Sequence, residues 1–389
     1  MAQARKSKRS PTAPWSCHKL SGGLTGRGFA GEDLRNPEIF LRSSFMHTVA
    51  VARHAMATRF EIVLCGENEV SLRAAAEEAL DEIERLDAQL SLYNPTSEIS
   101  HINACASHGP VRVEPALFRL LQHAQRLSRE TEGAFDITIA PLMRCWGFMR
   151  GAGKLPSPAE VADARSKAGM HLLELNENDF TVRAARAGVM LDLGAIGKGY
   201  ALERATELLR EAGVTSGLLH GGTSTVCAIG PPPDAEVWNV AMPHPDFAEQ
   251  AVASGAARLS DASGTGKILA IVPLKDEALS VSAVWGKAFR ANGRVYGHVI
   301  DPRTGEPVEG AVLAAVALPS ATETDALSTA LLIDGPGGHE RIAGLRAGTR
   351  TLVVSRGEGA GQFCLESRGI PLTDAALGGQ SNREVSPQN

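Results

Sequence analysis

Hydrophobic residues follow two different periods along the middle of the chain. In the segment RFEIVLCG, the apolar side chains of Phe60, Ile62 and Leu64 alternate with polar ones, which predicts a half-buried strand. Between Val70 and Leu90 the apolar positions fall three and four residues apart, which predicts an amphipathic helix. Both kinds of element are therefore expected within the first third of the chain.

The same patterns continue towards the C-terminus. A second helix is predicted to begin at Pro115, a favoured first helical position, and to stop before Gly133. Further helices are predicted near 158–169, 199–212 and 323–334. Strands are predicted around 171–175, 180–184, 188–193, 217–229, 237–242, 268–272, 279–282 and 295–300. Because strands come in adjacent groups, we expect one α+β domain of mixed sheets with flanking helices, not a doubly wound sheet.

The two ends of the chain lack such periodicity. Residues 1–48 are rich in Gly, Ser, Arg and Pro, and we expect a disordered leader there. Residues 366–389 are expected to form a disordered tail, which leaves 49–365 as the folded domain. The basic N-terminal segment is followed by no apolar stretch and no lipobox, so a cytoplasmic location is expected.

Composition excludes several functional classes. The formal net charge of -5 and the pI near 6.1 argue against a general nucleic-acid-binding protein. No apolar run reaches the roughly 18 residues of a membrane-spanning helix. The six cysteines are scattered without a Cys-x-x-Cys pair, so they are interpreted as thiols in a reducing compartment.

A glycine-rich turn is the first candidate for chemistry. In LDLGAIGKGYA, Gly194, Gly197 and Gly199 would let the backbone approach a ligand, and amides at a helix start can hold a phosphate. Lys198 adds a cation at the same place. The segment matches neither the Walker nor the Rossmann pattern. A tight strand-to-helix turn with a surface lysine is the alternative interpretation.

A carboxylate and a hydroxyl are spaced for one face of a helix in ATETDALSTAL. Asp325 and Thr329 are four residues apart, so their oxygens are expected side by side. Such oxygens suit Mg²⁺, which takes few protein ligands and completes its shell with water and phosphate. The alternative is an aspartate that favours the helix dipole and a threonine that packs its methyl group.

Three further segments combine polar groups with aromatic residues or turns. GAFDITIAPLMRCWGF places Phe135 beside Asp136, a pair that could clamp a planar heterocycle or belong to the core. LYNPTSEISHIN is a polar loop that begins near Tyr93. HVIDPRTGEPVEG carries His298, either a catalyst or a structural histidine, and a turn that Asp301 and Arg303 could stabilise.

Together these segments, in this order, resemble the FAD:protein FMN transferase family, the ApbE flavin transferases. The resemblance extends over roughly residues 56–335, and HVIDPRTG and LDLGAIGKGYA are its most specific parts. It implies a single ApbE-like domain. It also implies Mg²⁺-dependent transfer of FMN from FAD to a threonine hydroxyl of an acceptor protein, with release of AMP.

The resemblance also assigns residues. His298 and Asp325 correspond to the catalytic positions. Mg²⁺ would be held by Asp325, Thr329 and an oxygen of Ala195, which can only be a main-chain carbonyl. The positions that correspond to the flavin and diphosphate site are Met56, Tyr93, Ala134, Phe135, Asp136, Asp192, Lys198 and Ile300.

The chain departs from the family pattern at three places. Val281-Ser282-Ala283 stands where Thr-Ser-Gly is common, and Gly221-Gly222-Thr223-Ser224 stands where Gly-Gly-Gly-Asp/Asn is usual. The early Met-Gly-Thr is Met56-Ala57-Thr58. Flavin affinity or acceptor choice could therefore differ. Two other functions remain open: hydrolysis of FAD to FMN and AMP at the same Mg²⁺ site, and flavin binding without turnover.

Overall fold

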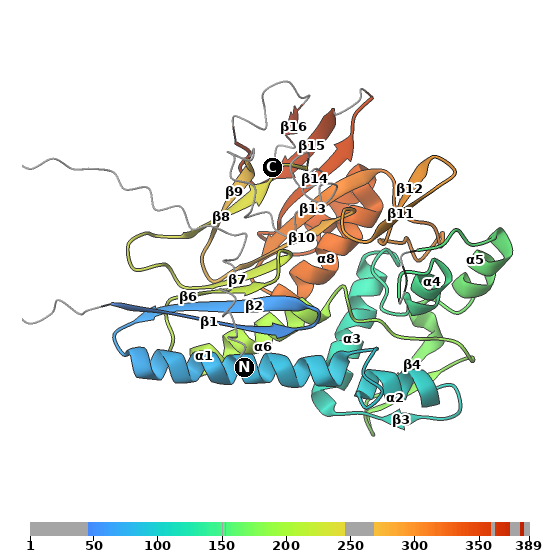
Figure 1. Ribbon diagram of the computed structural model, residues 1–389, viewed down its shortest axis with the longest axis horizontal. Helices are drawn as coiled ribbons and strands as arrows, with labels where there is room; N and C mark the ends of the chain where they lie inside the picture. The colour runs from blue at the N-terminus through green and yellow to red at the C-terminus, as the bar shows by residue number, and fades with distance from the viewer. Residues whose placement is uncertain are drawn as a thin grey trace, which may run out of the picture.

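Strands from both ends of the domain pair into one nine-stranded sheet in the computed structural model, which describes residues 46–149, 151, 153–245, 268–358, 362–373 and, as backbone, 382–384 (Figure 1). Their order in the sheet is β1 (His47–Ala55), β2 (Thr58–Gly66), β6 (Gly217–Gly221), β7 (Thr225–Ile229), β10 (Ala278–Ala283), β13 (Ala311–Leu318), β14 (Arg350–Arg356), β15 (Phe363–Arg368) and β16 (Asn382–Glu384). All neighbouring pairs are antiparallel except β15 with β16.

Both faces of this sheet are covered. The long helices pack on one face, where they share a core with Ile62, Leu219 and Val316; they are α1 (Glu69–Leu90), α6 (Gly197–Glu211) and α8 (Ala321–Asp334). The hairpin of β8 (Trp238–Pro243) and β9 (Ile268–Leu274) covers the other face, where Leu279 and Ala315 contribute. Strand β13 is consequently buried along its whole length.

A helical lobe lies between β2 and β6 in sequence and at one end of the sheet in space (Figure 1). It contains α2 (Glu98–Cys105), α3 (Pro115–Glu130), α4 (Ala140–Cys145), α5 (Pro158–Arg165) and the short helix η1 (Met170–Leu172). Its three-stranded sheet has the order β3 (Val111–Arg112), β5 (Thr181–Ala184), β4 (Leu173–Asn176).

Two smaller parts complete the described fold. A hairpin of β11 (Ala288–Ala291) and β12 (Arg294–Gly297) projects beside α4 and α5 (Figure 1). Helices η2 (Gly335–Gly338) and α9 (His339–Gly344) follow α8 and lead to β14.

The predicted α+β class is confirmed, as are the five predicted helices, which correspond to α1, α3, α5, α6 and α8. The strand predicted at 188–193 is wrong, because that segment joins no sheet. Asn103 holds it: its side-chain amide donates to the carbonyl of Leu191 at 3.0 Å and accepts from the Leu191 N–H at 2.6 Å. The strand predicted at 295–300 stops at Gly297, and only Ile300 makes an isolated bridge beyond it.

The predicted boundaries at 49 and 365 fall inside strands β1 and β15, so both need to move outward. Strand β16 lies within the predicted tail, and most of the predicted leader and tail lie outside the described residues. Within the residues that the structure describes, no helix is long and apolar enough to cross a membrane.

Candidate functional site

The first turn of α6 lies directly against α8. A Cβ atom added at Gly199 would lie 2.1 Å from the carbonyl oxygen of Ala321, so only glycine allows this approach. At the same point the Gly199 N–H donates to Oδ2 of Asp325 at 3.0 Å. The glycine-rich turn and the helix with the predicted metal ligands therefore form one site.

Asp325 is buried, with an exposed fraction of 4 %, and its second oxygen is also engaged. The hydroxyl of Thr225 donates to Oδ1 at 3.4 Å, and Lys198 Nζ lies 3.6 Å from the same atom. Lys198 also donates to the carbonyl of Gly194 at 3.0 Å. The site thus places a cation and a helix N-terminus, which favour an anion, beside a desolvated carboxylate, which favours a cation.

Hydroxyl groups surround the predicted ligand Thr329. Its Oγ1 donates to the carbonyl of Asp325 at 3.3 Å and lies 3.1 Å from Oγ of Ser282. Ser282 in turn lies 2.9 Å from Oγ of Ser328. Ser282 belongs to a stretch that departs from the family pattern, yet it contacts a predicted ligand.

The oxygen donors at this place fit a Mg²⁺ ion. Asp325 supplies one carboxylate, Thr329 one hydroxyl, and Ala195 lies in the turn just before α6. Among the described residues, no three His, Cys, Asp or Glu side chains gather as a metal-binding group. A cation held here would therefore need neutral oxygens and substrate phosphates to complete its shell.

The two remaining aspartates of the predicted site, Asp136 and Asp192, share one kind of environment. Burial raises the pKa of Asp192, although Oδ1 accepts from the Gly194 N–H at 2.8 Å and Lys198 opposes the shift. Burial also raises the pKa of Asp136, whose oxygens accept from the N–H groups of Thr138 and Met170 at 2.7 and 3.0 Å. Asp136 therefore fixes the local backbone.

The segments that contain Asp136 and Asp192 meet at the start of the glycine-rich turn. The N–H of Asp192 donates to the carbonyl of Ile137 at 2.7 Å. Ala134 and Phe135 precede this contact and are fully buried in the main core. The Phe135 ring therefore packs inside the protein, which favours the core interpretation of this residue over the aromatic clamp.

His298 follows the β11–β12 hairpin. Burial lowers its pKa, and the charges of Lys287 and Lys198 act in the same direction, against a backbone contact with Lys287 that raises it. Its Nδ1 is buried and has no hydrogen-bond partner among the described residues. The imidazole is therefore neutral near pH 7, the state in which it can accept a proton.

The turn after His298 is fixed by its own side chains. Arg303 donates to both oxygens of Asp301, at 2.9 and 2.8 Å, and lies 2.8 Å from Oδ1 of Asp334 at the end of α8. The indole N–H of Trp146 donates to the carbonyl of Gly305 at 2.8 Å. Asp301 and Arg303 are thus structural.

The other predicted flavin positions are spread around this centre. Ile300 is buried beside Trp146, whereas Tyr93 is 48 % exposed on the loop between α1 and α2. Met56 adopts a positive φ of 48° at the turn between β1 and β2. The next strand begins at Thr58, against which the backbone of Gly222 packs closely.

These segments occur together in a known family. The model of the ApbE family matches residues 56–352. The chain belongs to the ApbE family. An FAD:protein FMN transferase of Klebsiella pneumoniae is 27 % identical over 314 residues, which cover 78 % of this chain and 83 % of the relative. One from Treponema pallidum is 30 % identical over 280 residues, 68 % of this chain and 72 % of the relative.

Solved ApbE structures share the fold. The ApbE protein of Thermotoga maritima superposes with a TM-score of 0.69 at 25 % identity, covering 79 % of this chain and 94 % of that one. The apo flavinyl transferase ApbE of Pseudomonas stutzeri has a TM-score of 0.65 at 27 % identity, with 83 % and 95 % covered. The fold of this ApbE-family chain is therefore that of known flavin transferases.

Sequence reasoning missed Lys287 and Thr225 of this site, and it named Ser282 only within the stretch that departs from the family pattern. Lys287 acts electrostatically on both His298 and Asp192, and Thr225 binds Asp325 directly. Ser282 contacts Thr329. The pairing of β7 with β10 and the packing of β10 against α8 bring Thr225 and Ser282 to the site, whereas Lys287 lies between β10 and β11. No local spacing in the sequence could have indicated them.

Proposed function

We propose that this protein is an FAD:protein FMN transferase that moves FMN from FAD to a threonine hydroxyl of an acceptor protein and releases AMP. The observation that carries this proposal is the buried carboxylate of Asp325, which is held by the Gly199 amide with Lys198 beside it. Membership of the ApbE family, and relatives named for this activity, support the same reaction.

The reaction exchanges one phosphorus–oxygen bond for another. The threonine oxygen forms a bond to the FMN phosphorus, and the bond from that phosphorus to the bridging diphosphate oxygen breaks. AMP leaves with the bridging oxygen, and the threonine proton must pass to a base. His298 is suited to take it, because burial lowers its pKa and keeps the ring neutral.

Negative charge on the diphosphate is the main obstacle to this step. Asp325, Thr329 and the main-chain oxygen of Ala195 would hold Mg²⁺, which supplies charge neutralisation when bound. Lys198 adds a fixed cation, and the positive end of the α6 helix dipole favours phosphate at the same place. Asp192 is buried beside them and would orient the ligand through its hydrogen-bonding oxygens.

The flavin would lie among the remaining family positions. Tyr93 offers an exposed ring. Ala134, Phe135 and Asp136 can offer backbone groups only, since their side chains are buried. Met56 lies in the turn between β1 and β2, and Ile300 makes a bridge with Pro307 across the turn after His298.

Incubation with FAD, MgCl₂ and purified threonine-bearing flavoprotein apo-forms tests the proposal. We expect Mg²⁺-dependent release of AMP and a mass increase of the acceptor equal to FMN, lost when its threonine is replaced by valine. AMP with free FMN and no adduct on any acceptor would instead show hydrolysis of FAD. Flavin binding without AMP release would show a binding protein.

A further inference from the structure

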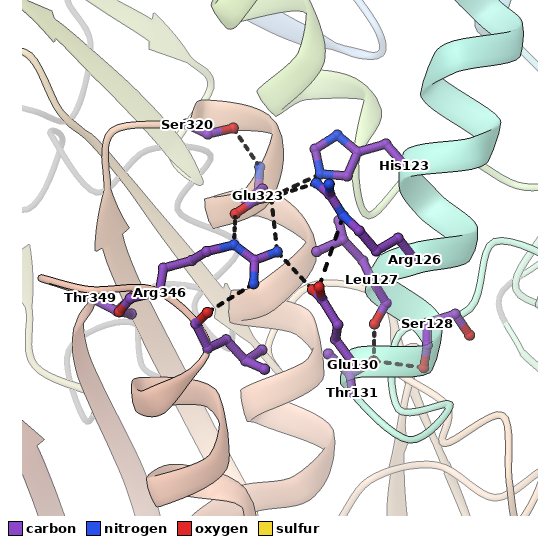
Figure 2. Close-up of polar contacts among 11 residues, drawn as sticks. His123, Arg126, Leu127, Ser128, Glu130, Thr131, Ser320, Glu323, Arg346 and Thr349 are labelled. Carbon is purple, nitrogen blue, oxygen red and sulfur yellow. Dashed lines mark hydrogen bonds and ion pairs between the residues drawn. The ribbon is translucent and has the colours of Figure 1, made fainter.

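Glu323 is the centre of a polar cluster on the side of α8 that faces away from Asp325. Its carboxylate accepts hydrogen bonds from His123 at 2.9 Å and from Arg126 at 3.1 Å, both on α3. Arg346, after α9, donates from Nε at 2.9 Å and from Nη2 at 3.1 Å (Figure 2). Glu323 is only 6 % exposed. Three segments of the chain therefore meet at one carboxylate.

The cluster extends along α3 towards the predicted flavin segment. Nη2 of Arg346 also donates to Glu130 at 2.7 Å, in the last turn of α3 (Figure 2). The adjacent Thr131 hydroxyl donates to the carbonyl of Leu127 at 2.8 Å and accepts from the Phe135 N–H at 3.2 Å. Arg346 thus joins α8 to the residues that begin the Ala134–Asp136 segment.

The first turn of α8 is also tied to α6. Glu203 accepts from the Ser320 hydroxyl at 2.7 Å and from the Thr322 N–H at 2.8 Å. The close approach of Gly199 to Ala321 lies on the same side. The contacts with α6 and the contacts of Glu323 therefore hold helix α8 from opposite sides.

Geometry connects this cluster to the metal ligand. Residues two positions apart on a helix point about 200° away from each other. A rotation of α8 that moved Asp325 away from Gly199 would consequently swing Glu323 out of the two-pronged contact with Arg346. Buried ion pairs add little net stability compared with apolar replacements, so their value lies in fixing geometry.

We propose that Glu323 is a positioning residue, which fixes α8 between α3 and α6 and thereby couples the Mg²⁺ ligand Asp325 to the flavin segment at Ala134–Asp136. The inference rests on the proposed function. It assigns to Glu323 a role in metal and flavin affinity without contact to either.

The test is the variant Glu323→Gln, which keeps the side-chain size and removes the charge. We expect the MgCl₂ concentration for half-maximal AMP release to rise about tenfold, as for other groups that orient metal ligands. The rise in melting temperature on addition of MgCl₂ and FAD should shrink in parallel, and this readout does not depend on turnover. Arg346→Lys keeps the positive charge but loses the planar guanidinium that binds Glu323 through two nitrogens. The MgCl₂ concentration for half-maximal AMP release in this variant should fall between those of the wild type and Glu323→Gln.

The matched control is Glu277→Gln, which removes an ion pair of 2.8 Å with Arg350 on the sheet. It should lower the melting temperature without changing the Mg²⁺ response. If Glu323→Gln behaves like this control, the cluster only stabilises the fold and the inference is wrong. If Glu323→Gln is unfolded, Arg346→Lys alone decides between the same two outcomes. A wild-type protein without Mg²⁺-dependent AMP release would instead refute the proposed function.

Discussion

The backbone N–H of Gly199 donates to the carboxylate of Asp325 at 3.0 Å across the contact between α6 and α8. This bond joins the glycine-rich turn to the predicted metal ligand, although 126 positions separate the two residues in the sequence. The bond orients the carboxylate, and the burial of Asp325 excludes water from it; both strengthen its interaction with a cation.

Gly199→Ala should damage the site without removing any ligand. The new methyl group would collide with the carbonyl of Ala321, so α6 and α8 must separate. We expect a loss of about 1–3 kcal/mol in the free energy of unfolding and a weaker response to MgCl₂. Urea unfolding and AMP release measured against MgCl₂ concentration check this. The control is Gly344→Ala in helix α9, where the backbone has no positive φ and a Cβ meets no atom within 4 Å.

Asp325→Asn should separate charge from hydrogen bonding. The amide oxygen can still accept from Gly199, whereas the negative charge beside Lys198 is lost. AMP release should fall by about 10²–10³ and lose its dependence on MgCl₂. A wild-type magnesium curve for this variant would remove Asp325 from the metal site.

Lys198→Ala should give the complementary result. Flavin fluorescence titrations should show weaker FAD binding, because a cation next to the predicted diphosphate position is gone. The MgCl₂-induced rise in melting temperature without FAD should persist. Unchanged FAD affinity would assign the lysine to the turn alone.

Arg303→Ala should affect stability and not chemistry. The guanidinium joins Asp301 to Asp334, and it is about one-third exposed, which limits the cost to about 1 kcal/mol. The melting temperature should fall, while the KM for FAD stays near the wild-type value. A large rise in KM at unchanged stability would contradict this structural role.

The pH dependence of AMP release should follow His298. Burial and nearby lysines lower its pKa, so the neutral base persists as the pH falls through 6.5, and kcat/KM should decline only below that value. Lys287→Met removes one of these charges and should shift the acid limb to higher pH. In His298→Ala the limb should disappear along with most activity, and a limb that stays in place would point to another base.

Local patterns predicted the long helices and strands β2, β6, β7 and β10 of the large sheet, but they missed its strands β1, β13, β14 and β15. The apolar spacing of α1 and the proline at the start of α3 were sufficient for those helices. Strand β13 was missed, because all eight residues of AVLAAVAL are buried between two covered faces and show no alternation. Alternation appears only where one face meets water.

The candidate site was predictable to the extent that its residues are neighbours in sequence. Asp325 with Thr329, and Gly197 with Lys198 and Gly199, share a helix turn or a loop. The roles of Thr225 and Glu323 depend on hydrogen bonds to partners that lie about a hundred or more residues away in the sequence. Such contacts depend on the packing of strands and helices, which no single segment encodes.

The order of strands in the large sheet follows their order in the chain. Every residue that the family resemblance assigns to metal, flavin or catalysis lies in a connection between two sheet neighbours, whereas Thr225 and Ser282, which contact Asp325 and Thr329, lie on β7 and β10. Met56 lies between β1 and β2, Lys198 between β2 and β6, His298 between β10 and β13, and Asp325 between β13 and β14. Strand pairing and reactivity are thereby encoded in separate stretches of the chain. Evolution can replace or lengthen one connection, and so alter the accepted substrate, while the pairing register of the strands in the large sheet stays unchanged.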